Sequence, residues 1–216
     1  MKKIQDHYFL KAKQENYPAR SVYKLQEIQK QCSLLGSGQT VLDLGAAPGS
    51  WTMYCAEKVG HGGRVLAVDL NPPAISFPPQ VTFVEDDAFS PGPELTAALD
   101  DHAPFDVVVS DMAPKTTGIK FADQANSLEL CQRALEMARA FLKPGGRFVT
   151  KIFQGPDVKA FEGEMRVSFA TVKAIKPKSS RPESKEIFYV GLGFRPAEAD
   201  SGYDPGRDSG FSTKDA

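Results

Sequence analysis

Hydrophobic positions along the chain follow two alternating patterns. Short, nearly continuous apolar runs bounded by Gly, Pro or Asp predict strands that are buried on both faces. These runs lie at 40–45, 64–70, 81–86, 105–111, 147–153, 170–175 and 186–194. Between them, apolar residues recur at three- and four-residue steps, which is typical of amphipathic helices. The expected helices lie at 19–31, 50–59, 93–100, 123–142 and 157–169.

This alternation predicts an α/β fold, because parallel strands need helical crossovers. Crossovers are right-handed, so helices cover both faces of a doubly wound, mostly parallel sheet. Such a sheet binds ligands beyond the carboxyl ends of its strands. We expect one domain over residues 1–195, with a basic helical extension at 1–35. Residues 196–216 are rich in Gly, Ser, Asp and Pro, and we expect a flexible tail there.

Charge is distributed unevenly along the 216 residues, although the net charge is only −1. Residues 1–30 carry seven Lys or Arg against three acids, and residues 173–185 carry five against one. Residues 85–111 carry eight acids and no Lys or Arg. This pattern is compatible with an anionic partner held beside an acidic pocket, but charges also cluster on surfaces by chance.

The cysteines and histidines indicate neither disulfides nor a metal site. Three of each are present, widely spaced and without a C-x-x-C motif. No run approaches the roughly 18 apolar residues of a membrane span, and the N-terminus lacks the apolar region of a signal peptide. We expect a cytoplasmic protein that binds neither membrane nor metal. The sequence does not indicate an oligomer, so a monomer is the default expectation.

The stretch DLGAAPGSW (43–51) follows the first strand and opens a helix. Its small residues, Gly45, Ala46 and Gly49, allow a ligand to approach the backbone closely. The spacing differs from the G-x-G-x-x-G dinucleotide fingerprint, and Pro48 removes an N–H that a phosphate could use. The turn therefore suits a nucleoside-like ligand without a pyrophosphate. An ordinary tight turn is the alternative.

Two acids follow the next strands. Asp69 ends the second strand and can accept both hydroxyls of a ribose, and Asp87 follows the third and can accept an exocyclic amino group. Either acid can instead cap the following turn. Together with the glycine turn, they favour S-adenosyl-L-methionine, an adenosine without phosphates that carries a sulfonium cation.

Charged residues interrupt or end several predicted strands. Lys151 stands inside the apolar run 147–153, where an unpaired lysine is rarely buried. Asp111 ends the preceding strand, and neighbouring parallel strands end on the same side, so the two can meet. If the last strand is antiparallel, Glu186 at its start reaches the same edge. Lys24 lies on the helix that precedes the first strand. A buried ion pair that braces the strand ends is the alternative for Lys151 and Asp111.

On these stretches the chain resembles the FtsJ/RrmJ family of RNA 2'-O-ribose methyltransferases, of the bacterial type that acts on large-subunit ribosomal RNA. The resemblance covers about residues 5–195. It is carried by the segments ARSVYKLQEIQ, VLDLGAAPGSW, VLAVDL, VVVSDMAP, LKPGGRFVTKIFQG and KPKSSRPESKEIFYV. The catalytic Lys-Asp-Lys-Glu tetrad of that family falls on Lys24, Asp111, Lys151 and Glu186.

The resemblance implies the Rossmann-like fold of S-adenosylmethionine-dependent methyltransferases, with an antiparallel last strand. It implies transfer of a methyl group to a ribose 2'-hydroxyl, that of a uridine, with Lys151 receiving the proton and Asp111 orienting it. The cofactor positions of the family fall on Gly49, Trp51, Asp69, Asp87 and Asp111. Ser50 is a departure, since relatives often carry a second glycine there.

RNA is the partner that the resemblance implies, in the large ribosomal subunit. We expect it to approach over the first helix and residues 173–185. The candidate phosphate contacts are Arg20, Lys24, Lys178 and Arg181, weighed evenly against ordinary solvated charges. Two alternatives stay open: methylation of another RNA, such as a transfer RNA or messenger cap, and a non-catalytic RNA-binding module for ribosome assembly that retains the cofactor. A small-molecule methyltransferase and an NAD-binding protein are disfavoured, because a long insertion and the third fingerprint glycine are missing.

Overall fold

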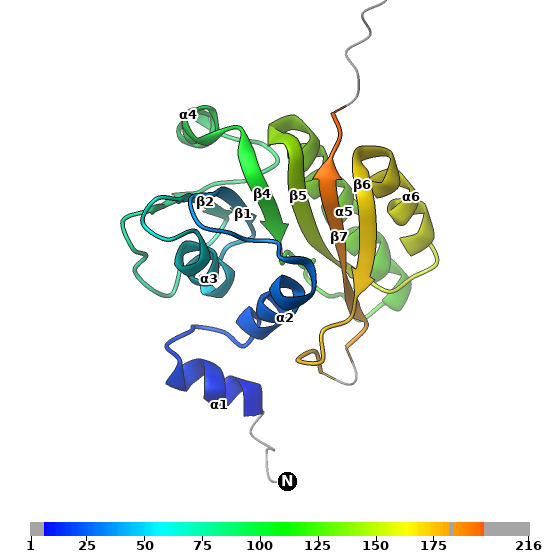
Figure 1. Ribbon diagram of the computed structural model, residues 1–216. Coiled ribbons are helices and arrows are strands. Elements are labelled where there is room, and N and C mark those ends of the chain that lie inside the picture. The colour runs from blue at the N-terminus through cyan, green and yellow to red at the C-terminus, as the bar shows by residue number, and fades with distance from the viewer. Residues whose placement is uncertain (1–6, 182–183, 197–216) are drawn as a thin grey trace, which may run out of the picture.

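The computed structural model describes residues 7–181 and 184–196, which form one seven-stranded sheet flanked by helices (Figure 1). The strand order is β3-β2-β1-β4-β5-β7-β6. The strands are β1 Thr40–Leu44, β2 Arg64–Asp69, β3 Val81–Glu85, β4 Phe105–Ser110, β5 Leu142–Phe153, β6 Phe169–Ile175 and β7 Glu186–Phe194. The helices are α1 His7–Gln14, α2 Val22–Cys32, α3 Ser50–Val59, α4 Pro93–His102, α5 Lys120–Phe141 and α6 Val158–Ser168.

The topology confirms the predicted doubly wound α/β fold. Strand β7 runs antiparallel to both of its neighbours, and the pairs among β3, β2, β1, β4 and β5 are parallel. The antiparallel direction of β7 places its first residue, Glu186, opposite Phe153 at the end of β5. The start of β7 and the carboxyl ends of β4 and β5 therefore share one edge of the sheet.

Strand β5 begins earlier than the predicted residue 147. Leu142 already pairs with Phe105, and the chain then makes an excursion before Arg147 pairs with Val107. Gly145, at φ +79°, takes the backbone through the left-handed region within this excursion. Helix α5 thus ends at Phe141, before the Pro-Gly-Gly sequence that was expected to stop it, and this sequence interrupts the strand pairing instead.

Each face of the sheet carries its own hydrophobic core. Val108 on β4 packs in the core beneath α4, α5 and α6, whereas its neighbours Val107 and Val109 pack in the core beneath α1, α2 and α3. All three valines are fully buried. Because both faces are covered, the strands need apolar residues at successive positions, which explains their continuous apolar runs.

Helix α2 is held against the start of α3. Its residues Val22, Leu25 and Ile28 are fully buried, on the side that the sequence predicted. Just before the helix, the Ala19 N–H donates to Ser50 Oγ at 2.7 Å. The Trp51 indole donates to the Ser21 carbonyl at 3.0 Å. The segment leading into α2 is therefore fixed relative to the glycine turn.

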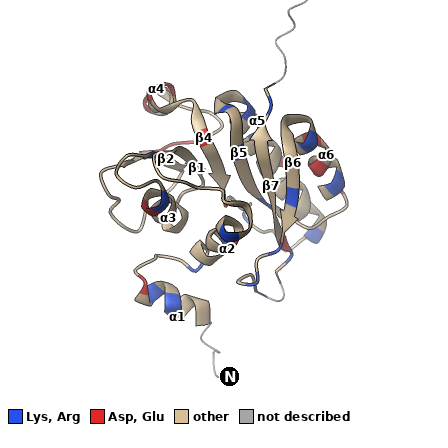
Figure 2. Cartoon of the chain, in the orientation of Figure 1, with Lys and Arg blue, Asp and Glu red and all other residues tan. Residues whose placement is uncertain are grey.

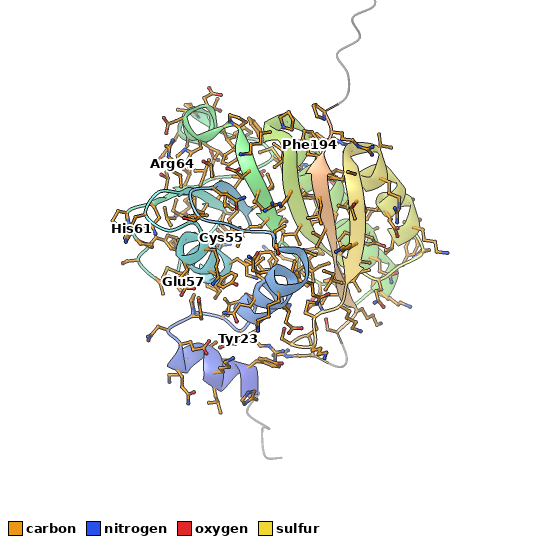
Figure 3. All side chains as sticks on the ribbon, viewed as in Figure 1. Tyr23, Cys55, Glu57, His61, Arg64 and Phe194 are labelled. Atoms are coloured by element: carbon orange, nitrogen blue, oxygen red, sulfur yellow. The ribbon has the colours of Figure 1, made fainter. Side chains whose placement is uncertain are left out.

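Helix α1 packs on the outside of α2. The Tyr8 and Tyr23 rings lie 5.3 Å apart, and the side chain of Tyr23 lies between the two helices (Figure 3). In the described residues, no helix is long and apolar enough to cross a membrane. The tail predicted at 196–216 falls, after its first residue, outside the part of the chain that the structure describes.

Candidate functional site

Lys151 and Asp111 form an ion pair at the carboxyl edge of the sheet. Ser110 of β4 is in register with Thr150 of β5, so the next residue of each strand lies beside the other. Lys151 Nζ lies 2.9 Å from Asp111 Oδ1 and 2.5 Å from the Asp111 carbonyl oxygen. Lys151 is only 8 % exposed. This pairing explains how a lysine is tolerated at the end of a buried strand.

A second ion pair joins α2 to β7. Lys24 Nζ contacts Glu186 Oε1, and Ser180 Oγ donates to the same oxygen at 3.1 Å. The Lys24 amine also lies 5.8 Å from the centre of the Phe188 ring. Both charged side chains are largely buried. An amine from the N-terminal part of the chain and a carboxylate from its last strand thus meet at the sheet edge.

The two ion pairs belong to one electrostatic cluster. Burial alone raises the pKa of Glu186, but the hydrogen bond and charge of Lys24 and the charge of Lys151 outweigh it. The pKa of Glu186 therefore lies below its ordinary value, and the side chain stays ionised at neutral pH. The structure brings Lys24, Asp111, Lys151 and Glu186 together, as two amines that are each paired with a carboxylate.

The glycine turn lies next to this cluster. Gly45 and Gly49 have φ values of +78° and +115°, which favour glycine. A Cβ atom on Gly45 would lie 2.3 Å from Met112 Cγ, so the residue after Asp111 packs directly on the turn. Ala46 is buried, and Pro48 is exposed. Any ligand bound over the turn would therefore lie beside the Asp111 and Lys151 pair.

The acids that follow β2 and β3 have structural partners. Asp69 Oδ2 accepts the Ala47 N–H at 3.0 Å, and Oδ1 accepts the Asn71 N–H at 2.8 Å. Asp87 Oδ1 accepts the Phe89 N–H at 2.9 Å. Both acids thus support turns, as the alternative interpretation held. They remain half-buried, and a carboxylate oxygen can accept more than one hydrogen bond, so both can still contact a ligand.

The side chain of Trp51 is buried in the core, so it cannot contact a ligand directly. The indole is 3 % exposed and packs 5.8 Å from the Phe188 ring, between α3 and β7. Only its backbone remains at the turn, in the first turn of α3, where N–H groups have no partner within the helix.

Asp43 is a buried acid near Asp69 and Asp111 that the sequence analysis did not single out. It is fully buried on β1, and Thr52 Oγ1 donates to Oδ2 at 2.6 Å. Among the described residues, nothing bonds its other oxygen, Oδ1. Burial raises the pKa of Asp43 to about 7, the Thr52 hydrogen bond opposes this, and the charges of Asp111 and Asp69 add to it. An acid inside an apolar run was the available signal, as it was for Lys151.

The predicted RNA contacts surround a loop between β6 and β7. The Glu27 carboxylate of α2 accepts the N–H groups of Lys178 and Ser179 at 2.7 and 2.9 Å, and Arg20 donates to the Ser179 carbonyl. Arg20 therefore anchors the loop. Lys178 and Arg181 are exposed. Lysines and arginines occur on α1, α2 and this loop, at one side of the molecule (Figure 2).

The acidic segment 85–111 contributes less to the site than predicted. Asp106, at the amino end of β4, pairs with Lys143, and Asp101 pairs with Arg64 at the amino end of β2. The segment crosses the molecule through α4, so these acids lie at the opposite edge of the sheet. Asp111 directly follows β4, and Asp87 lies two residues after β3, both at the carboxyl edge.

Comparisons with known proteins show the family and the fold of the chain. Residues 17–194 match the FtsJ-like methyltransferase family. The chain belongs to the FtsJ-like methyltransferase family. A protein named ribosomal RNA large subunit methyltransferase E from Oleidesulfovibrio alaskensis is 60% identical over 195 residues, which are 90% of this chain and 94% of that protein. The protein of the same name from Lawsonia intracellularis is 50% identical, over 90% of this chain and 98% of its own length.

Solved structures show the same fold. A Plasmodium falciparum protein designated a ribosomal RNA methyltransferase superposes with a TM-score of 0.72 at 26% identity, covering 82% of this chain and 98% of its own. Fibrillarin from Aeropyrum pernix, solved with natively bound S-adenosyl-L-methionine, superposes with a TM-score of 0.56 at 16% identity, covering 80% and 76%. In this FtsJ-like chain, the described residues contain no group of three or more His, Cys, Asp or Glu that could hold a metal ion.

Proposed function

We propose that the protein uses S-adenosyl-L-methionine to methylate the 2'-hydroxyl of a ribose, that of a uridine, in large-subunit ribosomal RNA. The observation that carries this proposal is the Lys151 and Asp111 pair, which lies beside the glycine turn and next to a second pair, Lys24 and Glu186. The names of relatives that are 50% to 60% identical over nearly the full chain support ribosomal RNA as the substrate.

The residues around the glycine turn fit the proposed cofactor. Gly45 and Gly49 give the turn its left-handed backbone conformation, and Asp69 and Asp87 provide acceptors for ribose hydroxyls and an amino group. Asp43 is fully buried, so its charge would favour a cationic ligand through the field that it creates rather than by direct contact. When bound, the cofactor supplies an activated methyl group on a positively charged sulfur.

Each residue of the cluster has a chemical role in this proposal. Lys151 Nζ, after its ammonium form has lost a proton, would accept the proton of the 2'-hydroxyl as that oxygen takes the methyl group, and the electron pair of the broken methyl–sulfur bond would stay on the sulfur. Asp111 fixes the amine through the 2.9 Å contact. Lys24 and Glu186 position the ribose and its phosphate. Alignment of this kind can lower a barrier by about 7–11 kcal/mol, so positioning alone can account for much of the rate.

The proposed function is tested by mapping the methylated position. Cofactor labelled in its methyl group is incubated with the protein and total RNA, both as free RNA and within ribosomal particles, taken from cells that lack the gene. We expect label on one ribose 2'-oxygen of the large-subunit RNA. Label on a base, on transfer RNA or on a messenger cap would contradict the proposed substrate. Cofactor binding without any transfer would favour the non-catalytic alternative.

A further inference from the structure

Glu186 forms part of the walls of two neighbouring cavities. One, of about 440 Å³, contains Arg20, Lys24 and Arg181 and lies on the α2 side of Glu186. The other, of about 400 Å³, lies at the start of α5 and contains Lys120, Phe153 and Lys185. Ser184 and Glu186 line both cavities. Glu186 therefore borders a basic cavity that contains Arg20 and Lys24 and a second cavity whose two lysines are balanced by Asp123 and Glu186.

The proposed reaction does not use the cavity at the start of α5. Its floor is the end of the β5–β7 pair, where the Gln154 N–H donates to the Lys185 carbonyl at 2.8 Å. Its volume lies in the range of small-molecule sites. Two of its side chains on α5 already have partners, since Asp123 Oδ1 accepts from the backbone and hydroxyl of Thr117 and Gln124 donates to the Gln154 carbonyl. These contacts shape the cavity.

The remaining side chains of this cavity suit a nucleotide. Lys120 and Lys185 are exposed amines, which pair with phosphates. Phe153 is a half-buried aromatic ring, and bases of single-stranded RNA stack on such rings. Just outside, Ile119 and Phe121 are 65% and 70% exposed, although large apolar side chains usually avoid water. A ligand with a flat apolar face and a negative charge satisfies both features.

We propose that this cavity, at the start of α5, binds the nucleotide next to the methylated one in a single-stranded segment of the substrate RNA. The inference rests on the proposed function. The RNA strand then runs from the cavity that contains Arg20 and Lys24, past Glu186, to the cavity that contains Lys120 and Phe153. The base of the neighbouring nucleotide stacks on Phe153, and Lys120 and Lys185 hold its phosphates. This arrangement directs the intervening ribose toward Lys151.

Photo-crosslinking tests the path of the strand directly. p-Benzoylphenylalanine replaces Phe121, and the protein is irradiated with large ribosomal subunits from cells that lack the gene. The crosslinked nucleotide is read by reverse transcription and compared with the methylated position. We expect crosslinks at the nucleotide beside the methylated one or the next along. The same amino acid at Val167, which is 77% exposed on α6, is the matched control and should give no crosslink there.

Kinetics provide a second measurement that does not depend on the crosslinker. Phe153→Leu keeps an apolar side chain but removes the stacking surface, and we expect it to raise KM for the subunits about tenfold without changing cofactor affinity. Lys120→Ser and Lys185→Ser should each reduce the slope of log affinity against log salt by about 0.7. Thermal unfolding of each variant checks that the fold is intact.

The outcomes separate the two proposals. If the natural protein methylates no ribose, the proposed function fails, whatever the crosslinks show. If it methylates a ribose, but Phe121 crosslinks to distant nucleotides and the three substitutions leave KM and the salt slope unchanged, only the proposed nucleotide site is wrong.

Discussion

Lys151 and Asp111 lie at the ends of adjacent parallel strands, with Nζ and Oδ1 2.9 Å apart, although forty positions separate them in the chain. A buried ion pair of this kind often contributes no more stability than apolar side chains of the same size. The position of the pair beside the glycine turn is what the proposed reaction requires of it. The second ion pair, between Lys24 and Glu186, lies at the same carboxyl edge of the sheet.

Replacing Lys151 should separate catalysis from cofactor binding. Lys151→Ala removes the proton acceptor, and we expect methyl transfer to fall by about 10²–10⁴-fold. Cofactor affinity should stay nearly intact, because the glycine turn does not include this side chain. A calorimetric titration and a tritiated-methyl assay measure the two quantities. Lys143→Ala, at the opposite edge of the sheet, is the matched control and should keep full activity. Substantial turnover by Lys151→Ala would falsify the role of Lys151.

Asp43 should make both stability and cofactor affinity depend on pH. The pKa of Asp43 is about 7 in the folded protein and near 3.8 in the unfolded chain. Between about pH 4 and 7 the folded protein therefore holds a proton on Asp43 that the unfolded chain has lost. The free energy of unfolding should therefore fall as pH rises from about 4 to 7, by up to about 4 kcal/mol. Asp43→Asn should remove this component. Chemical denaturation at several pH values measures it.

The same substitution tests whether the charge of Asp43 favours a cationic ligand. In the natural protein, cofactor affinity should increase as pH rises through 7, because Asp43 becomes charged. Asp43→Asn should bind more weakly at pH 8 and lose this component of the pH dependence. Equal pH profiles in the two proteins would contradict a role for Asp43 in binding.

The sequence predicted which edge of the sheet carries the site, but it did not predict each contact there. The direction of β7 decided whether Glu186 joins Asp111 and Lys151, and the antiparallel arrangement confirmed that expectation. The burial of the Trp51 indole and the anchoring role of Arg20 were not predictable, because they depend on how α2 packs against α3 and on where the β6–β7 loop lies. Local patterns indicate that a residue stands at an edge, whereas its partners come from distant segments.

Ser50 should act as a positioning residue for Lys24. Its hydroxyl both accepts the Ala19 N–H at 2.7 Å and donates to the Ala19 carbonyl at 3.1 Å, which fixes the segment leading into α2. Ser50→Ala removes both bonds and should cost about 1–2 kcal/mol of stability.

The kinetic effect of Ser50→Ala should exceed this loss of stability. We expect kcat to fall several-fold while cofactor affinity stays the same, because Lys24 would be less firmly placed next to Glu186. Ser168→Ala, which loses a hydrogen bond from Arg139 on α5, is the control for a merely structural bond. If both variants lose stability equally and neither changes kcat, Ser50 has no positioning role.

Glu27 should control RNA affinity by holding the β6–β7 loop against α2. Its carboxylate accepts two backbone N–H groups, from Lys178 and Ser179, and carries no contact with the glycine turn among the described residues. Glu27→Gln can keep only part of this arrangement, because an amide has one acceptor oxygen. We expect KM for the RNA substrate to rise about threefold to tenfold, equivalent to the roughly 1 kcal/mol of one hydrogen bond, with cofactor affinity unchanged.

Glu57→Gln on α3, whose carboxylate accepts a hydrogen bond from the Tyr17 hydroxyl, is the matched control and should leave KM unaltered. The two values come from methyl-transfer rates over a range of RNA concentrations, and an unchanged KM for Glu27→Gln would show that the loop does not contact RNA.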